Sequence, residues 1–326
     1  MITCRITLST IAVLSFVLSA GGQAAAQPYP TRLIKLIVPS PPGGPHEVVV
    51  RALAERMSAA LRQSVIVENK PGAGGAIGAK AVVAAAPDGH TLLVSTPNPL
   101  VVAPTLYKNP GYDPATDLVP VATAFSSPQM LVAHPTFAVN SIGDIVAYAK
   151  ANPGKLNYAS PGYGTAPHLL GELFRIATGT DIVNVRYKGG GESVIGMLTG
   201  QVHMGFEIVP LLLGHIQADK LKAIAVADAT RSAQLPNVPT TVESGFPDLQ
   251  ATLWLGVMAP AGTPADIVNR LNATINAIMH SKDLEASLDK LGATPKTGLP
   301  REVSAFMAAE RKKWAEVIRT AGISID

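Results

Sequence analysis

Leu33–Met57, with the sequence LIKLIVPSPPGGPHEVVVRALAERM, decides the fold class. Its first six residues are almost all apolar and predict a buried strand over Leu33–Val38. Two prolines and two glycines at residues 41–44 end this strand, and helical spacing of apolar residues begins at Val48. A strand that turns sharply into a helix leaves unpaired N–H groups at the helix start, where the helix dipole also favours an anion. The stretch therefore predicts an α/β protein with an anion site at this turn.

A cleavable leader precedes this stretch. Met1–Ala26 combines a basic residue, Arg5, with an interrupted apolar run over Ile6–Leu18 and a small-residue end, which together predict a signal peptide cut before Gln27. The alternative is a retained membrane anchor, but the apolar run is short for a membrane span. We therefore expect export to a Gram-negative periplasm.

Composition and motifs exclude several function classes. The single cysteine, Cys4, lies in the leader, so the mature chain has no disulfide and no thiolate metal site. Charged residues make up 15% of the chain, and no basic run predicts nucleic-acid binding. No HExxH, GxSxG or phosphate-binding loop occurs. We predict no catalytic residue, metal or cofactor, although a triad assembled in space stays open.

Strands and helices alternate along the rest of the chain, which favours βαβ units with largely parallel sheets. The middle third predicts strands at Leu156–Ser160, Ile182–Tyr187 and Val202–Glu207. Glycine marks three strand-to-helix turns, at residues 41–44, 161–166 and 189–191. Ligands of open α/β sheets bind beyond the carboxyl ends of strands. Two α/β lobes with such turns, facing each other, would form a cleft lined by helix N-termini, and motion about a hinge would close it.

Local signals predict particular helix ends. Ser141, with Asp144 three residues later, is typical of a capped helix start. Thr263 before Pro264 predicts a hydroxyl cap for the first of two C-terminal helices, and the last helix is expected over Arg301–Ala321.

Several motifs allow two interpretations. Gly72–Gly78 has the glycines of a dinucleotide loop but not their spacing, so close helix packing is the better interpretation. His46 either is exposed or caps a helix, or it contacts a ligand carboxylate or ring. His168 is either buried against the sheet or part of a site, and Trp254 either fills the core or forms a cleft wall. Thr165 can cap a helix, bind an anion, or do both.

Aromatic residues near the predicted strand ends suggest an apolar ligand body. Tyr163, Tyr187 and Phe206 are placed in this way.

Segments along nearly the whole mature chain resemble the tripartite tricarboxylate transporter receptor family, the Bug-type periplasmic solute-binding proteins. The matching segments are IVPSPPGG (37–44), VIVENKPGAGGAIGAK (65–80), APDGHTLL (86–93), NPGKLNYASPGYGT (152–165), HLLGELF (168–174), VRYKGGG (185–191), GQVHMGF (200–206), LPNVPTTVESGFP (235–247) and LWLGVMAPAGTP (253–264). The resemblance implies a type II periplasmic binding protein with two α/β lobes around a hinged cleft. It also implies carboxylate uptake together with a small and a large membrane subunit, without catalysis or a metal.

The resemblance further implies a set of ligand-binding positions in loops at strand ends. They are Pro42, Gly43, Gly44, Pro45, His46, Glu47, Thr96, Asn98, Gly162, Tyr163, Gly164, Thr165, His168, Lys188, Gly189 and Glu207. Family members usually carry small residues at positions 45 and 46, Asp at position 47 and Asp or Asn at position 207. Pro45 and His46 add apolar and ring surface, which leads to the hypothesis of a ring-bearing or bulky carboxylate, such as an aromatic dicarboxylate.

The expected organisation is a leader over residues 1–26, a discontinuous first lobe over 27–128 and 250–326, and a second lobe over 129–249. The expected function is a monomeric periplasmic receptor for an organic carboxylate. A periplasmic enzyme on the same scaffold and a ligand-dependent partner of a membrane sensor kinase stay open as alternatives.

Overall fold

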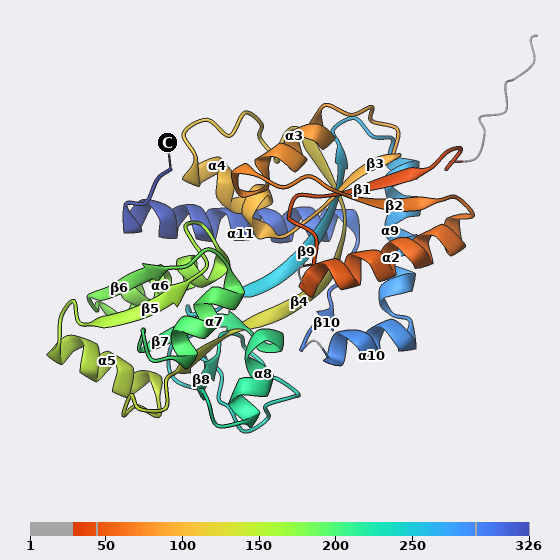
Figure 1. Cartoon of the computed structure of the whole chain (residues 1–326). Helices are drawn as coiled ribbons and strands as arrows, with labels where there is room; N and C mark the ends of the chain where they lie inside the picture. Colours follow the sequence, from red (N-terminus) through yellow and green to blue (C-terminus); the bar gives the residue numbers. More distant parts are fainter. Residues whose placement is uncertain (1–28, 44, 291, 326) are drawn as a thin grey trace, which may run out of the picture.

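The computed structural model describes residues 29–43, 45–290 and 292–325 (Figure 1). The predicted leader, its cut before Gln27 and the cysteine Cys4 lie outside the described residues, as does Gly44. Pro45 and His46 are described only as backbone in the first turn of a helix, and their side chains lie outside the description.

The first lobe is built from the two ends of the chain around one mixed sheet of order β2-β1-β3-β9-β4, with β10 on the other edge of β4. The parallel strands are β1, β2 and β3, whereas β9 runs antiparallel to both β3 and β4. The N-terminal elements are β1 (Ile34–Val38), α2 (Pro45–Leu61), β2 (Val65–Asn69), η1 (Ala73–Gly75), α3 (Ala76–Val83), β3 (Thr91–Ser95), η2 (Asn98–Val102) and α4 (Ala103–Leu106). The C-terminal elements are β9 (Thr252–Pro260), α9 (Ala265–Met279), α10 (Lys282–Lys290), β10 (Thr294–Pro295) and α11 (Pro300–Ala321).

The second lobe is formed by the middle of the chain around a sheet of order β8-β4-β7-β5-β6. Here β5 pairs in parallel with β6 and β7, whereas β4 is antiparallel to β7 and β8. The elements are α5 (Ile142–Ala151), β5 (Leu156–Ser160), α6 (Ala166–Thr178), β6 (Ile182–Arg186), α7 (Gly190–Leu198), β7 (Met204–Ile208), α8 (Val209–Gln217) and β8 (Lys222–Val226). The predicted architecture of two α/β lobes is confirmed.

One long strand, β4 (Leu118–Ala133), belongs to both sheets (Figure 1). Its residues 118–128 pair with β9, and residues 129–133 pair with β7 and, from residue 130, with β8. At the change of partners the Gln129 N–H donates to the Ala251 carbonyl at 2.9 Å. The division into lobes at 128/129 and 249/250 stays a prediction, because strand pairing alone does not show which segments move together.

The prediction of largely parallel sheets is wrong for the strands at the centre of the molecule, since β4 and β9 are antiparallel to their neighbours. The strand β4 is absent from the elements predicted above. Its sequence, LVPVATAFSSPQMLVA, contains two prolines and a pair of serines, which break the alternating pattern of a strand. The pairing tolerates them through register shifts near Pro120 and between Thr123 and Ser126.

Two of the expected helix ends differ in outcome. The Asp144 N–H donates to the Ser141 hydroxyl at 3.1 Å, so the cap of α5 is confirmed. The Thr263 cap is wrong, because its hydroxyl donates to the Pro260 carbonyl at 2.7 Å and Pro264 stands at the N-cap of α9. The C-terminal part has three helices rather than two, since the short and largely charged α10 gave no clear apolar signal.

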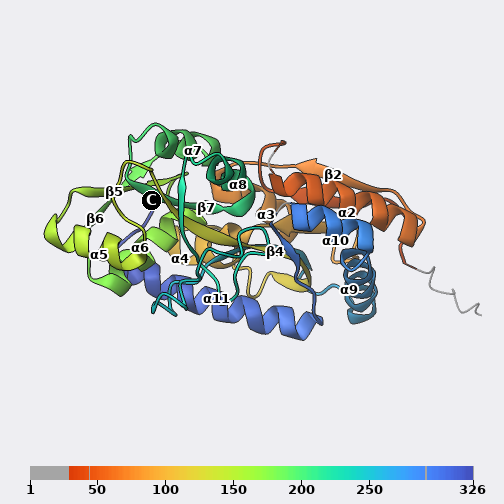
Figure 2. The same ribbon diagram turned by 90° about the horizontal axis from the view of Figure 1, so that it is seen from below.

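Helix α11 ties the two lobes together. It packs on η2 and β4 and also on α6 of the second lobe (Figure 2). Trp254 is fully buried beneath it, with its ring 5.2 Å from that of Phe306 and its indole N–H donating to Glu310 at 3.0 Å. Of the two interpretations of Trp254, core packing is confirmed.

Candidate ligand-binding cleft

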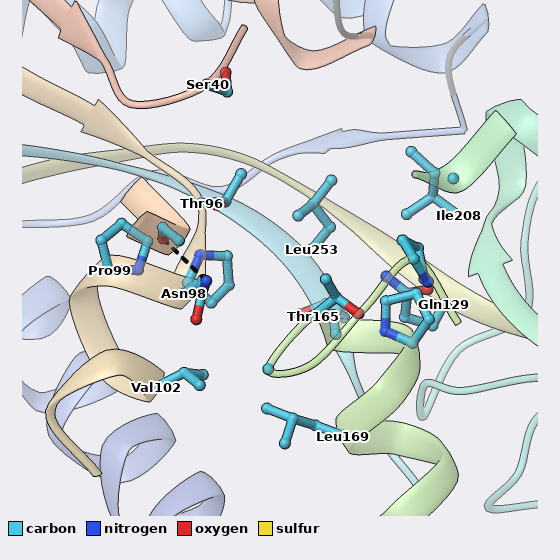
Figure 3. Close-up of a pocket in the computed structure, with 18 of the residues that line it drawn as sticks. Ser40, Thr96, Asn98, Pro99, Val102, Gln129, Thr165, Leu169, Ile208 and Leu253 are labelled. Carbon is cyan, nitrogen blue, oxygen red and sulfur yellow. Dashed lines mark hydrogen bonds between the residues drawn. The ribbon is translucent and has the colours of Figure 1, made fainter. Parts of the chain in front are cut away.

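A cavity of about 320 Å³ lies between the two lobes, where strand ends from both sheets meet. The first lobe contributes the chain after β1 and β3, and the second lobe contributes the start of α6 and the end of β7 (Figure 3). Polar side chains on its wall come from Ser40, Thr96, Asn98, Gln129, Thr165, Glu207 and Thr252. The rest of the wall is mostly aliphatic, with Val38, Val94, Val102, Leu169, Ile208 and Leu253.

On the first-lobe side, η2 presents Asn98 to the cavity (Figure 3). The Asn98 amide N–H donates to the Gly74 carbonyl at 3.0 Å, and its buried Oδ1 has no hydrogen-bond partner among the described residues. Gly74 has a φ of 62°, and a Cβ there would stand 2.4 Å from the Tyr107 hydroxyl. The glycines of residues 72–78 therefore permit close packing behind the cavity, which is the interpretation that the spacing favoured.

On the second-lobe side, the turn after β5 leads into the N-terminus of α6. Gly164, Thr165, Ala166 and Pro167 all line the cavity. The first turn of α6 carries no acidic residue, so no carboxylate of its own offsets the partial positive charge of this helix end. The Thr165 hydroxyl donates to the Gly162 carbonyl at 2.7 Å and makes no cap bond to α6. Pro167 has no N–H, and the N–H groups of Gly164 and Thr165 donate to His168 and to the Gly162 carbonyl. The arrangement therefore offers an anion the Ala166 N–H together with the positive end of the helix dipole.

His168 holds this turn in place by a hydrogen bond to its backbone. Its side chain is buried and does not line the cavity, and its Nδ1 accepts a hydrogen bond from the Gly164 N–H at 3.2 Å. Burial lowers the pKa of His168, which favours the neutral ring that such an acceptor needs. Of its two interpretations, burial is confirmed.

Glu207, at the end of β7, is the one ionisable residue among the described residues of the cavity wall. The side chain is 4% exposed, and its Oε1 accepts a hydrogen bond from the Ser193 hydroxyl at 3.1 Å. Burial raises the pKa of Glu207 to about 7, although the hydrogen bonds from Ser193 and from the Ile208 backbone act in the opposite direction. Burial therefore favours the neutral form of this carboxyl group.

Among the described residues of the first-lobe turn, Pro42, Gly43 and Glu47 do not line the cavity. Pro42 and Gly43 are exposed, and the Gly43 N–H donates to the Glu47 carboxylate. Glu47 is buried and also pairs with Arg51, one turn further along α2. The carboxylate of Glu47 is therefore bound within its own helix start.

The remaining second-lobe positions also lie outside the wall. Gly162, Lys188 and Gly189 do not line the cavity, and the Lys188 N–H donates to Glu192 at 3.1 Å. Tyr163 is 46% exposed, with the Arg186 guanidinium 4.3 Å from its ring centroid. Tyr187 and the buried Phe206 are also absent from the wall. The expected aromatic lining is thus reduced, among the described residues, to Trp314 of α11.

Sequence reasoning missed several wall residues, of which Gln129 is the most informative. It is 2% exposed, stands where β4 changes sheets, and its Oε1 has no hydrogen-bond partner within the described parts of the chain. A lone polar residue before the apolar run MLVA was the available signal, but it had meaning only once β4 was recognised as a strand.

The model of the tripartite tricarboxylate transporter family receptor (TctC) matches residues 49–323. The chain belongs to this receptor family. Protein BugT of Bordetella pertussis is 39% identical over 319 residues, which cover 97% of this chain and 98% of BugT. The family resemblance found in the sequence is thereby confirmed, and the family is one of solute-binding receptors rather than enzymes.

Solved structures support the same assignment for the receptor. R. palustris Rpa4515, solved with adipate, has a TM-score of 0.80 and 34% identity, covering 91% of this chain and 99% of that one. The periplasmic binding protein BugD has a TM-score of 0.77 and 34% identity, with the same coverage of 91% and 99%. MatC from Rhodopseudomonas palustris, with bound malate, has a TM-score of 0.77 and 30% identity, covering 89% and 100%.

Two features are absent from the described part of the receptor. No cluster of three or more metal-ligating side chains occurs among these residues. Nor does any of the described helices have both the length and the apolar character needed to cross a membrane.

Proposed function

We propose that this receptor captures an organic carboxylate in the periplasm and passes it, chemically unchanged, to a membrane transporter. The observation that carries the proposal is the start of α6, whose residues line the cavity and which has no acidic residue in its first turn. A ligand carboxylate would accept there from the Ala166 N–H, and from the Thr165 hydroxyl once it turns from the Gly162 carbonyl to the ligand. The adipate and malate in two related structures are ligands of this chemical class.

The described wall favours a linear aliphatic body for the ligand. Val102, Leu169 and Leu253 face the middle of the cavity (Figure 3). The hypothesis of a ring-bearing carboxylate depended on Pro45 and His46, whose side chains lie outside the described residues. Aliphatic side chains bury a methylene chain without the stacking surface that a ring prefers.

The remaining parts of the proposal concern delivery. The leader over residues 1–26 would export the chain with a cut before Gln27. The two lobes, 27–128 with 250–326 and 129–249, would close on the ligand by a hinge at the crossing of β4. A monomer in this closed form would then dock on the small and large membrane subunits of the transporter.

A thermal-shift panel tests the ligand class. Adipate, malate, a benzene dicarboxylate and an uncharged diol of matching length would each be added to the purified mature chain. At a hundredfold excess over its dissociation constant, a true ligand adds about 2.7 kcal/mol to the free energy of unfolding. We expect stabilisation by an aliphatic dicarboxylate and none by the diol. Stabilisation by the benzene dicarboxylate alone would overturn the aliphatic body, and no response to any acid would overturn carboxylate capture.

Recovery of the ligand distinguishes a receptor from an enzyme. The stabilising acid would be incubated with a stoichiometric amount of protein for a day, released by denaturation and analysed by nuclear magnetic resonance. We expect the acid to return unchanged, whereas a product would show that the scaffold is catalytic.

A further inference from the structure

Glu207 stands apart from every other residue on the cavity wall. It is the one ionisable side chain among the described residues that line the cavity, which otherwise presents hydroxyls, amides, backbone and apolar groups. No described lysine, arginine or histidine lines the cavity beside it. A negatively charged ligand would therefore meet a buried carboxyl group with no cation to separate the two charges.

The groups around Glu207 do not supply that cation. Opposite it on β4 stands Met130, and Ser193 of α7 donates to its Oε1 at 3.1 Å. Gly190 of α7 leaves only a narrow space on that side, since a Cβ there would stand 3.1 Å from Oε1.

Titratable groups on the elements packed against β7 bond to other partners or lie outside the cavity wall. On α6, Glu172 accepts from Arg175 at 2.9 Å and from Tyr158 of β5 at 3.0 Å, and His168 accepts from the Gly164 N–H. Glu192 of α7 accepts from the Lys188 N–H, and His215 of α8 does not line the cavity. The described residues of β4 contain no titratable side chain.

We propose that Glu207 meets the captured anion as a neutral carboxylic acid, donating its O–H to one ligand carboxylate, so that ligand and proton enter the cavity together. The inference rests on the proposed function, because it requires an anionic ligand. No covalent bond of the ligand breaks. Where Glu207 is ionised beforehand, its carboxylate takes a proton from water or the buffer as the ligand binds, and this proton stays on Glu207 within a charge-assisted hydrogen bond. The neutral acid also makes the site selective, since a ligand with a carboxylate at this end of the cavity binds more tightly than one with a hydroxyl or a methyl group there.

The direction of the pH dependence follows from linkage. Burial raises the pKa of Glu207 to about 7 in the ligand-free chain, and a bound carboxylate would raise it further. Below this pKa the acid is already neutral and the affinity is constant. Above it each ligand must bring one proton, so the affinity falls by up to tenfold per pH unit.

Isothermal titration of the mature chain with adipate and malate from pH 6 to pH 9 tests the inference. Between about pH 7 and pH 9 both carboxylates of each probe are ionised, so a change in affinity there belongs to the protein. We expect the affinity to weaken by about fiftyfold between pH 7 and pH 9. Titrations in two buffers of different ionisation enthalpy should show the uptake of close to one proton per ligand at pH 8.

Glu207→Gln keeps a hydrogen-bond donor at this position but removes the group that titrates. The amide keeps an N–H donor, so we expect binding within about threefold of the original chain at pH 6, no pH dependence up to pH 9 and no proton uptake. Glu172→Gln is the matched control, because Glu172 is also a buried acid of the second lobe but lies off the cavity wall. It should leave the pH profile and the proton uptake unchanged, and thermal unfolding of both variants confirms that they fold.

The competing role for Glu207 is an ionised partner of a ligand ammonium group, and aspartate is the probe for it. Aspartate that binds more tightly at pH 9 than at pH 6 and is lost in Glu207→Gln would overturn the inference. Equal affinity for adipate or malate at pH 6 and pH 9 would also overturn it, while leaving carboxylate capture intact. Failure of every acid to bind at pH 6 would overturn the proposed function as well.

Discussion

The first-lobe turn at residues 39–47 and the second-lobe turn at residues 161–168 follow the same local plan but differ in what their helix ends bind. Both run from a strand through proline and glycine into a helix. In the first turn Glu47 accepts from the Gly43 N–H and pairs with Arg51. In the second turn the start of α6 has no acidic residue and lines the cavity.

The third glycine turn behaves like the first. Glu192, in the first turn of α7, accepts from the Lys188 N–H at 3.1 Å. A carboxylate four residues after a loop N–H thus completes the anion site from within the chain in both α2 and α7. The starts of both α6 and α7 reach the cavity, through Gly164–Pro167 and through Gly190, but of these two helices only α6 has no acidic residue in its first turn. A helix N-terminus without a carboxylate of its own is the better place for a ligand anion.

The largest effect is expected from giving α6 a carboxylate like that of the other two turns. Ala166→Glu would place a negative charge at the first residue of α6, on the cavity wall, where it would occupy the helix end and repel an anionic ligand. We expect at least a hundredfold loss of adipate or malate affinity by titration calorimetry. Ala177→Glu is the control for charge alone, because Ala177 is exposed near the other end of α6. An unchanged affinity in Ala166→Glu would remove α6 from the site.

The second largest effect is expected from Glu207→Gln, which changes the buried acid of the second lobe. Its effect on stability is to be compared with that of Glu47→Gln in the first lobe. The folded pKa of Glu207, about 7, lies above the usual value of 4.5, so the folded chain binds the proton more tightly than the unfolded chain. The ligand-free protein therefore loses stability as the pH rises from about 4.5 to about 7. Glu207→Gln should remove this loss and raise the free energy of unfolding at pH 8 by about 2–3 kcal/mol. Urea unfolding at pH 4.5 and pH 8 measures it, and equal stability of both proteins at pH 8 would contradict it.

Glu47→Gln should lower the free energy of unfolding, whereas Glu207→Gln should raise it. The substitution removes a charged acceptor from the Gly43 N–H and from Arg51, so we expect a loss of about 1–2 kcal/mol in the free energy of unfolding. Ligand affinity should stay within about threefold, because Glu47 does not line the cavity. Glu55→Gln, at an exposed position of the same helix, is the control. A large loss of affinity with unchanged stability would show that the first turn also serves the ligand.

The smallest effect is expected from Thr165→Ala. Its hydroxyl lies on the cavity wall and donates to the Gly162 carbonyl, so its loss removes one hydrogen bond from the turn and one polar group from the site. We expect a threefold to tenfold weaker affinity for the carboxylate, which corresponds to about 1 kcal/mol. Thr199→Ala is matched to it, since the Thr199 hydroxyl also donates to a backbone carbonyl but away from the cavity. Equal effects of the two variants would reduce Thr165 to a structural role.

The sequence by itself determined the α/β class, the positions of most strands and helices, and the family. These depend on local periodicity, on proline and glycine at turns and on segments that match in order. The family resemblance in the sequence also implied Thr96, Asn98, Gly164, Thr165 and Glu207 as ligand-binding positions, and these five residues line the cavity.

Only the tertiary structure decided which helix start remains open and which residues complete the wall. Glu47 was implied as a ligand-binding residue, but its carboxylate accepts from the Gly43 N–H, just as Glu192 accepts from the Lys188 N–H. Gln129 lies on the cavity wall because β4 changes sheets at that residue, where its partner changes from β9 to β7, two strands from distant parts of the chain. Local patterns cannot encode such contacts, since hydrogen bonding and burial depend on residues that only folding brings together.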